Sequence, residues 1–167
     1  ISQRRCVLVV HTRRRAGRRR RHSFDRHQAR YLSAYYVLAD GKAAAVGVNT
    51  YGQLGDGSTD LRSTPVAVSF PGSSTLRVPA VAAGTVHAVY LMSDGTARGP
   101  GRNTVGQLGD IDSMDRTTNI YTGTFFMNFA SSDEIVSIAA GGYHTVFVLT
   151  DGTVKTAGQT DNYQGQV

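Results

Sequence analysis

The chain has 167 residues, a length that favours a single domain. The chain has one cysteine, Cys6, so an internal disulfide is excluded. Its apolar runs, such as Cys6 to Val10, are too short for a transmembrane helix. The net charge of +6 is concentrated at one end: residues 1–30 carry eleven arginines and one acidic residue, whereas residues 31–167 carry seven basic and eleven acidic residues.

Residues 1–28 are predicted to be an arginine-rich tail that is disordered or is not native sequence. The runs Arg13 to Arg15 and Arg18 to Arg21 have two functional interpretations. The first is a segment that binds nucleic acid or acts as a nuclear signal, and the second is an acid-poor targeting peptide. A frameshift or a misread exon in GC-rich DNA is the third interpretation, because no lysine accompanies these arginines. The apolar residues before them lack a cleavage site, which argues against a secretory signal. The sequence does not name the compartment, but it favours a cytoplasmic or nuclear protein over a secreted one.

Residues 29–167 consist of repeats, with boundaries near 29–81, 82–138 and 139–167. The string Gly-Gln-Leu-Gly-Asp occurs at 52–56 and at 106–110, and each copy begins eleven residues after the glycine of an Asp-Gly pair. In a weaker third copy, Gly165-Gln166-Val167 takes the place of Gly-Gln-Leu. A period of 54 to 57 residues indicates stacked or radially arranged supersecondary units.

Each Asp-Gly pair joins two short, strand-like runs, which predicts a β-hairpin. We expect type I′ turns, which require positive φ at both central residues, because Asp and Gly tolerate this conformation best. The run before each pair is apolar on both faces, which is typical of a strand covered on both sides. With the short strand-like stretches between repeats, each repeat offers about four strands, as a propeller blade does.

A second shared string precedes two of the hairpins and ends at a histidine: Val81 to His87 and Ile138 to His144. Its Ala-Ala-Gly segment suits a crowded strand near the centre of a radial assembly. Because the two histidines hold equivalent positions, we expect them to be structural, for example by fixing a turn through a hydrogen bond.

The order Ala-Ala-Gly-x-x-His, Asp-Gly, Gly-x-Asn-x-x-Gly-Gln-Leu-Gly-Asp resembles the regulator of chromosome condensation (RCC) repeat over about residues 29–167. The resemblance implies an all-β fold: a partial arc of a β-propeller with four-stranded blades, seven-bladed when complete. The motif residues are expected to be structural. They are Asp40, Gly41, Asn49, Gly52, Gln53, Leu54, Gly55, Gly84, His87, Asp94, Gly95, Asn103, Gly106, Gln107, Leu108, Gly109, Gly141, His144, Asp151, Gly152, Asn162, Gly165 and Gln166.

The sequence departs from the family pattern in two respects. Val46, Pro100 and Ala157 stand where family repeats usually carry an aromatic residue before the glycine of Gly-x-Asn, which predicts looser packing. The chain also holds about two and a half repeats, whereas propellers close with about 4 to 8 blades. We therefore expect it to be a fragment of a longer protein.

No catalytic, cofactor-binding or metal-binding residues are predicted. A phosphate-binding loop needs Gly-Lys-Ser/Thr, but the only Gly-Lys, Gly41-Lys42, is followed by Ala43. The carboxylates between Asp110 and Asp115 lack the glycine and closing glutamate of a calcium loop, so a solvated loop is favoured. No nucleophile with a neighbouring base is recognisable, and we predict that the chain is not an enzyme.

The resemblance implies a non-catalytic module for protein-protein interaction. Within the family the propeller surface serves nucleotide exchange on the small GTPase Ran, partner or substrate binding in HERC-type ubiquitin ligases, and enzyme inhibition. The ultraviolet photoreceptor branch is excluded, because its chromophore is tryptophan and this chain has none. A guanine-nucleotide exchange factor is the first alternative, and chromatin or nucleic-acid binding through the arginine-rich tail is the second. No membrane partner is expected.

Overall fold

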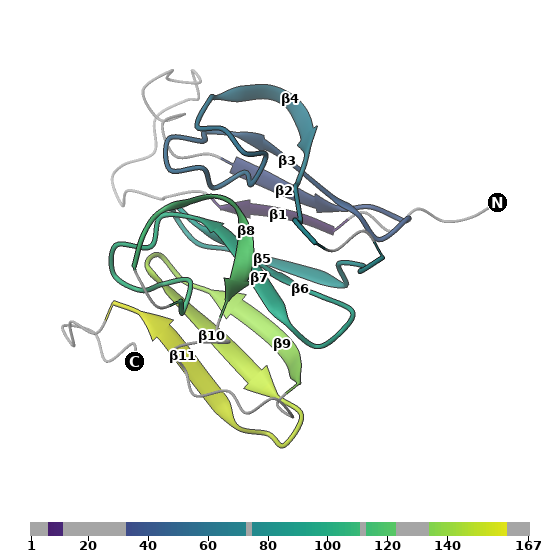
Figure 1. Cartoon of the computed structure of the whole chain (residues 1–167), viewed down its shortest axis with the longest axis vertical. Coiled ribbons are helices and arrows are strands. Elements are labelled where there is room, and N and C mark those ends of the chain that lie inside the picture. The colour runs from purple at the N-terminus through teal and green to yellow at the C-terminus, as the bar shows by residue number, and fades with distance from the viewer. Residues whose placement is uncertain (1–6, 12–32, 73–74, 111–112, 123–133, 160–167) are drawn as a thin grey trace, which may run out of the picture.

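The computed structural model describes residues 7–11, 33–72, 75–110, 113–122 and 134–159. In these ranges the chain is all-β, and every sheet is antiparallel. Three sheets, of order β1-β2-β3-β4, β5-β6-β7-β8 and β11-β10-β9, fan out as successive blades of an arc (Figure 1). The strands are β1 (Val7–His11), β2 (Ser33–Val37), β3 (Ala43–Gly47), β4 (Arg62–Ala67), β5 (Ala80–Ala83), β6 (Ala88–Leu91), β7 (Ala97–Gly101), β8 (Arg116–Thr122), β9 (Ile135–Ala140), β10 (His144–Leu149) and β11 (Val154–Gly158).

The prediction of a partial propeller arc with four-stranded blades is confirmed. The first two blades have four strands each, and three strands of the third lie in the described residues. The first strand of each blade lies beside that of the next, β1 by β5 and β5 by β9. β5 and β9 end in the Ala-Ala pairs of the repeat, so small side chains line the crowded inner edge of the arc.

The first blade includes a strand from within the arginine-rich segment. β1 pairs antiparallel with β2, with Val7 opposite Val37 and His11 opposite Ser33. The blade therefore takes in residues upstream of the predicted repeat boundary at residue 29. The arginine runs that follow β1 lie outside the described residues.

The core lies between the blades and is divided by β6. Ala88 and Tyr90 belong to a cluster shared with the first blade, whereas Val89 and Leu91 belong to a cluster shared with the third. All four side chains are buried, so this strand is covered on both faces as its apolar run predicts. β2 and β10 instead alternate between buried and half-buried residues, because a described blade covers each of them on one face only.

The three Asp-Gly pairs lie in hairpin turns, as predicted, but the turns are not type I′. Gly41, Gly95 and Gly152 have φ of 81°, 78° and 84°, whereas the preceding aspartates are not among the described residues with positive φ. In the first hairpin Gly41 N donates to Leu38 O at 2.9 Å, and Leu38 N donates to Lys42 O at 2.8 Å. This is a three-residue loop whose last residue is left-handed, so only the glycine needs positive φ.

The aspartate of each pair has a different local role from the one predicted. Its Oδ1 accepts the backbone N–H two residues later, from Lys42, Thr96 and Thr153 respectively, at 2.8–3.0 Å. The glycine that follows connects the blades: Gly41 O accepts from Val78 N, and Gly95 O accepts from Ile135 N, both at 2.8 Å. Each of these hairpins thus fixes the segment that leads into the next blade.

Candidate functional site

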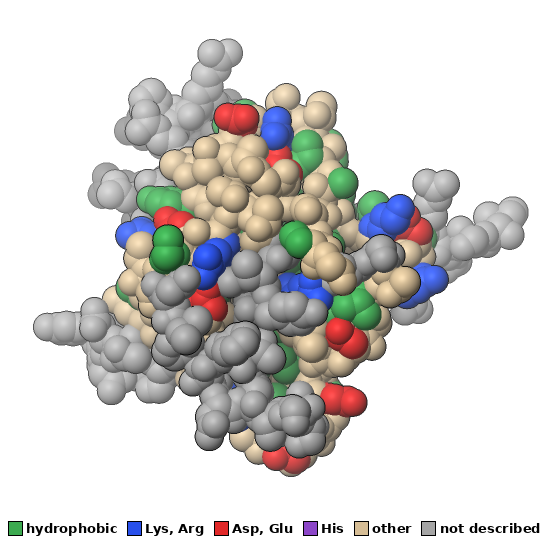
Figure 2. Space-filling view, in the orientation of Figure 1, with side chains coloured by type: hydrophobic (Ala, Val, Ile, Leu, Met, Phe, Trp, Pro, Cys, Tyr) green, Lys and Arg blue, Asp and Glu red, His purple; other side chains and the backbone are tan. Residues whose placement is uncertain are grey.

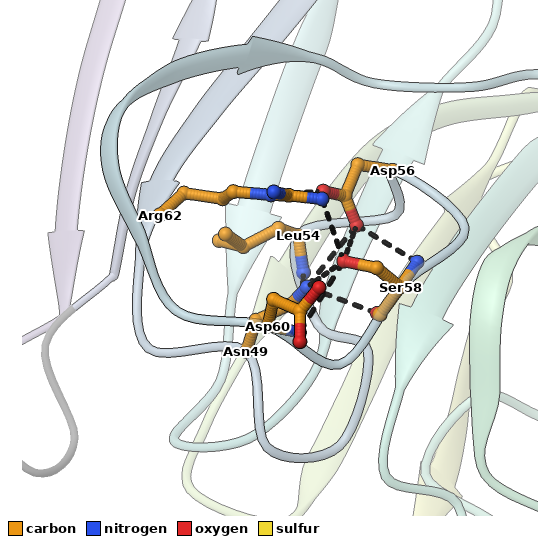
Figure 3. Close-up of polar contacts among 6 residues, drawn as sticks. All are labelled: Asn49, Leu54, Asp56, Ser58, Asp60 and Arg62. Atoms are coloured by element: carbon orange, nitrogen blue, oxygen red, sulfur yellow. Dashed lines mark hydrogen bonds and ion pairs between the residues drawn. The ribbon is translucent and has the colours of Figure 1, made fainter.

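Asn49 holds together the loop that contains the first Gly-Gln-Leu-Gly-Asp string, between β3 and β4 (Figure 3). Its Oδ1 accepts a hydrogen bond from Leu54 N at 2.9 Å. Its Nδ2 donates to Asp56 Oδ1 at 3.1 Å and to the Ser58 carbonyl at 2.9 Å. Asn49 is 1% exposed, and both the oxygen and the nitrogen of its side-chain amide bond within the loop.

Asp56 connects this loop to the start of β4. Its Oδ2 accepts from Arg62 Nε at 2.6 Å, and its Oδ1 accepts from the backbone N and the hydroxyl of Ser58 at 3.0 and 2.9 Å. Burial alone raises the pKa of Asp56, but the hydrogen bonds from Arg62, Ser58 and Asn49 together outweigh it and hold the pKa below its ordinary value. The carboxylate is therefore ionised and fully engaged by the loop.

This lowered pKa predicts acid-sensitive stability. Because the pKa of Asp56 is lower in the folded chain than in the unfolded chain, its contribution is present above about pH 4 and is lost as the pH falls through the folded value. We expect Asp56→Asn to lower the free energy of unfolding by about 1–3 kcal/mol at pH 7. The difference from the wild type, measured by urea denaturation, should shrink as the pH is lowered below about 4. A difference that stays the same over the whole acid range in which the chain folds would contradict the assignment.

The second repeat builds the same loop at the same spacing. Asn103 Oδ1 accepts from Leu108 N at 2.8 Å, and its Nδ2 donates to Asp110 Oδ1. Asp110 Oδ2 accepts from Arg116 Nη2 at 3.0 Å, and the aspartate is 7% exposed. The expectation of a solvated loop is therefore wrong for Asp110, because an arginine stands where it can neutralise the buried carboxylate.

The prediction of motif residues missed these two ion pairs. Asp56 and Asp110 close the Gly-Gln-Leu-Gly-Asp strings, and each is followed six residues later by an arginine, Arg62 or Arg116. That repeated Asp-x5-Arg spacing was the available signal. The predicted motif residues Asn162, Gly165 and Gln166 lie outside the described residues, so the third copy of the loop is not placed.

The glutamines of the two strings also fix their loops. Gln53 Oε1 accepts from Tyr51 N at 2.9 Å, and Gln107 Oε1 accepts from Val105 N at 3.1 Å. Their backbone carbonyls each accept a hydroxyl, from Tyr35 at 3.1 Å for Gln53 and from Thr145 at 2.7 Å for Gln107. Tyr35 belongs to the same blade as its partner, whereas Thr145 belongs to the next blade.

His87 joins the second blade to the third. It is fully buried, and its Nε2 lies 3.0 Å from Thr145 Oγ1. Because the Thr145 hydroxyl donates its proton to Gln107 O, His87 Nε2 is the donor in this pair. The glycine of Gly-x-x-His makes room for the ring: a Cβ at Gly84 would lie 2.1 Å from His87 Cε1. These contacts support the predicted structural role of the histidine.

We expect Thr145→Val to destabilise the contact between the second and third blades. The valine has nearly the same shape but leaves the buried Gln107 carbonyl without its hydroxyl donor and His87 Nε2 without an acceptor, a loss of about 1–3 kcal/mol. Thr145→Ser keeps the hydroxyl and is the matched control. Chemical denaturation of both variants should show the larger loss for valine; equal losses would mean that the hydroxyl is not what matters.

Two further findings concern the described residues. Within them, no group of three or more His, Cys, Asp or Glu could hold a metal ion. In the same part of the chain no helix is long and apolar enough to cross a membrane. The polar residues of the two described repeat loops bond to one another and to the backbone.

Comparison with known proteins gives consistent matches. The family model described as the regulator of chromosome condensation (RCC1) repeat matches residues 40–91, and a second model of the same description matches residues 135–166. The human protein named probable E3 ubiquitin-protein ligase HERC4 is 37% identical over 129 residues, which are 74% of this chain and 11% of HERC4. The human X-linked retinitis pigmentosa GTPase regulator is 30% identical over 131 residues, 78% of this chain and 12% of that protein.

Solved structures share the fold. Human WBSCR16 aligns with a TM-score of 0.66 at 20% identity, over 75% of this chain and 30% of that chain. Yeast RCC1 (Prp20), in its complex with Kap60, aligns with a TM-score of 0.61 at 22% identity, over 75% of this chain and 30% of that chain. The chain thus spans about a tenth of the two curated relatives and about a third of the solved propellers.

Proposed function

This chain belongs to the regulator of chromosome condensation (RCC1) repeat family, and we propose that it is a non-catalytic module whose loops bind a protein partner. The observation that carries the proposal is how the polar residues of the repeat are used. Asn49, Asp56 and Arg62 bond within one loop, and Asn103, Asp110 and Arg116 repeat the pattern. With these groups engaged in the scaffold, the exposed loop residues remain for recognition.

Exposed apolar side chains in the loops support recognition of a protein partner. Leu61, Val105 and Met114 are loop residues that are 68%, 41% and 59% exposed. Hydrophobic, basic and acidic side chains are interspersed over the face seen in Figure 2. Relatives of this fold are known with protein partners, since Prp20 was solved with Kap60 and studied for binding to Gsp1p and histones.

Peptide selection tests the interaction module directly. A phage-displayed library of random twelve-residue peptides would be selected on the immobilised chain, and enriched peptides would be measured by fluorescence anisotropy. We expect a reproducible set of related sequences that compete with one another. Enrichment of no sequence beyond that on a blank surface would contradict the proposal.

Guanine-nucleotide exchange is the alternative that the family and the binding of Prp20 to Gsp1p favour. We expect no exchange activity, because a catalyst must displace bound nucleotide and no inserted segment for that purpose is recognisable in the sequence. Release of a fluorescent guanine nucleotide from Ran, with and without the chain, is the measurement. Acceleration in proportion to the concentration of the chain would establish the alternative.

Nucleic-acid binding is the second alternative, and it depends on the arginine-rich segment. Binding of duplex DNA should then disappear when Arg13 to Arg15 and Arg18 to Arg21 are replaced by glutamine. This variant does not change the residues of β1, so a loss of DNA binding could not be attributed to loss of that strand from the first blade. Binding that survives the replacement would place any nucleic-acid site elsewhere in the chain.

A further inference from the structure

Tyr51 and Arg102 meet where the first and second blades adjoin. Tyr51 lies in the loop after β3, and Arg102 follows β7 directly. The Arg102 guanidinium carbon lies 5.2 Å from the centroid of the Tyr51 ring, a cation-π contact between blades. Arg102 Nε donates to Thr104 Oγ1 at 3.0 Å, and its backbone N donates to Val86 O at 2.8 Å. The guanidinium is therefore held in place before any partner arrives.

Arg102 differs from the other described arginines in what it bonds to. Arg62 and Arg116 form ion pairs with aspartates, while Arg77 and Arg98 donate to backbone carbonyls at 3.3 and 2.9 Å. Within the described part of the chain, neither a carboxylate nor a carbonyl takes up the terminal nitrogens of Arg102. A guanidinium in this state keeps the two parallel N–H groups that bind a carboxylate in a fork.

The surroundings of Arg102 suit a protein segment. Thr50 and Thr104 are exposed, Tyr51 is half-buried, and Val105 is 41% exposed. We call Thr50, Tyr51, Arg102, Thr104 and Val105 the seam patch. Tyrosine and arginine are, with tryptophan, the residue types enriched among residues that dominate binding energy at protein interfaces. An arginine already stacked on tyrosine also loses little conformational entropy on binding.

We propose that the seam patch binds an acidic segment of a partner protein, with a glutamate or aspartate carboxylate on Arg102 and an apolar neighbour against Val105. The proposal rests on the interaction function above and specifies its site. The pairing of tyrosine with arginine occurs at the junction of the first and second blades. At the junction of the second and third blades, Val105 and Gln159 hold the positions equivalent to Tyr51 and Arg102, so the patch is not extended by a second cation. A protein carboxylate fits such a single, oriented guanidinium.

The charge of the described body argues against a nucleic acid at this site. The described residues include seven basic and eight acidic ones. Binding to nucleic acid depends on many phosphate contacts by lysine and arginine, which one isolated guanidinium does not supply. Duplex DNA is therefore included in the test as a competing probe.

The test uses the peptides selected on the wild-type chain. We expect the enriched sequences to contain Asp or Glu beside an apolar residue, and Arg102→Gln to weaken their binding about 10- to 100-fold. Arg102→Lys keeps the charge without the fork and should fall between. Arg77→Gln is the matched control, because Arg77 is an exposed arginine beside the Asp40-Gly41 hairpin and the substitution removes the same charge.

The outcomes separate this inference from the proposed function. Peptides that bind equally well to the wild type and to Arg102→Gln would overturn the seam patch and leave the interaction module standing. Failure to select any peptide would overturn both. Binding of duplex DNA that is lost in Arg102→Gln would assign the patch to nucleic acid and overturn the acidic segment. Melting curves of each variant would confirm that lost binding is not lost folding.

Discussion

Gly101→Ala is expected to destabilise the second blade by more than about 4 kcal/mol, which is exceptional for one added methyl group. Gly101 has a φ of 112°, a backbone conformation that residues with a Cβ rarely adopt. A Cβ there would lie 2.5 Å from Val86 O and 2.7 Å from His87 Cα. Both atoms are backbone atoms, and Val86 O accepts a hydrogen bond from Arg102 N. The neighbours therefore cannot move aside without breaking this hydrogen bond.

Gly152→Ala is the matched control for this prediction. Gly152 also has positive φ, at 84°, but no atom lies within 4 Å of the position where a Cβ would be. We expect a loss of only about 1–2 kcal/mol, the usual strain of a left-handed residue. Urea denaturation followed by circular dichroism would measure both variants. Similar losses at the two positions would show that the space around Gly101 is not limiting.

The repeat spacing predicted those parts of the fold that depend on residues close in sequence. The hairpins at Asp40-Gly41, Asp94-Gly95 and Asp151-Gly152 form between residues close in sequence. The apolar run before Asp94-Gly95 likewise predicted that β6 is buried on both faces. The turn type was wrong because Asp-Gly is compatible with several hairpin loops. The choice among them depends on which carbonyl accepts the glycine N–H, and this cannot be inferred from the dipeptide.

Contacts between distant residues were the part that sequence reasoning could not reach. Thr145 binds the carbonyl of Gln107, 38 residues away, and no pattern along the chain marks the pair. In the second blade the equivalent of Thr145 is Ala88, which has no hydroxyl, and Tyr35 supplies one to Gln53 instead. The glutamine carbonyl of each loop thus accepts a hydroxyl from a residue at a different position in the repeat. Comparison of repeated motifs therefore does not reveal this hydrogen bond.

The strand β1 was missed for a related reason. Val7 to His11 carries neither the Ala-Ala-Gly segment of β5 and β9 nor their glycine-histidine spacing, so nothing in its sequence identifies it as the first strand of a blade. Its arginine-rich surroundings favoured a tail. Its pairing with β2 runs over five residue pairs, and these contacts depend on the fold as a whole.

Residues 29–167 expressed alone are expected to be unstable or to self-associate at micromolar concentration. Without β1, the strand β2 would become an edge with unpaired backbone groups, which invites pairing between chains. The third blade adds an apolar face. Val146 and Val148 hold the positions of Val89 and Leu91, which pack between the second and third blades, yet within the described residues no further blade covers them. Repeat units bury such faces only against neighbours.

Sedimentation velocity and thermal melting would decide the prediction, and paired substitutions would separate its two causes. Val148 and Val154 lie opposite each other on β10 and β11, and Val154 is 59% exposed. If this face drives association, Val148→Lys with Val154→Lys should shift the species towards monomer, because two ammonium groups oppose burial of the face. Leu61→Lys, at a 68% exposed loop residue, is the control and should change little.

If association persists in the double variant but disappears in residues 1–167, the β2 edge is its cause. A sharply melting monomer of residues 29–167 would show that two blades and part of a third suffice for a stable fold.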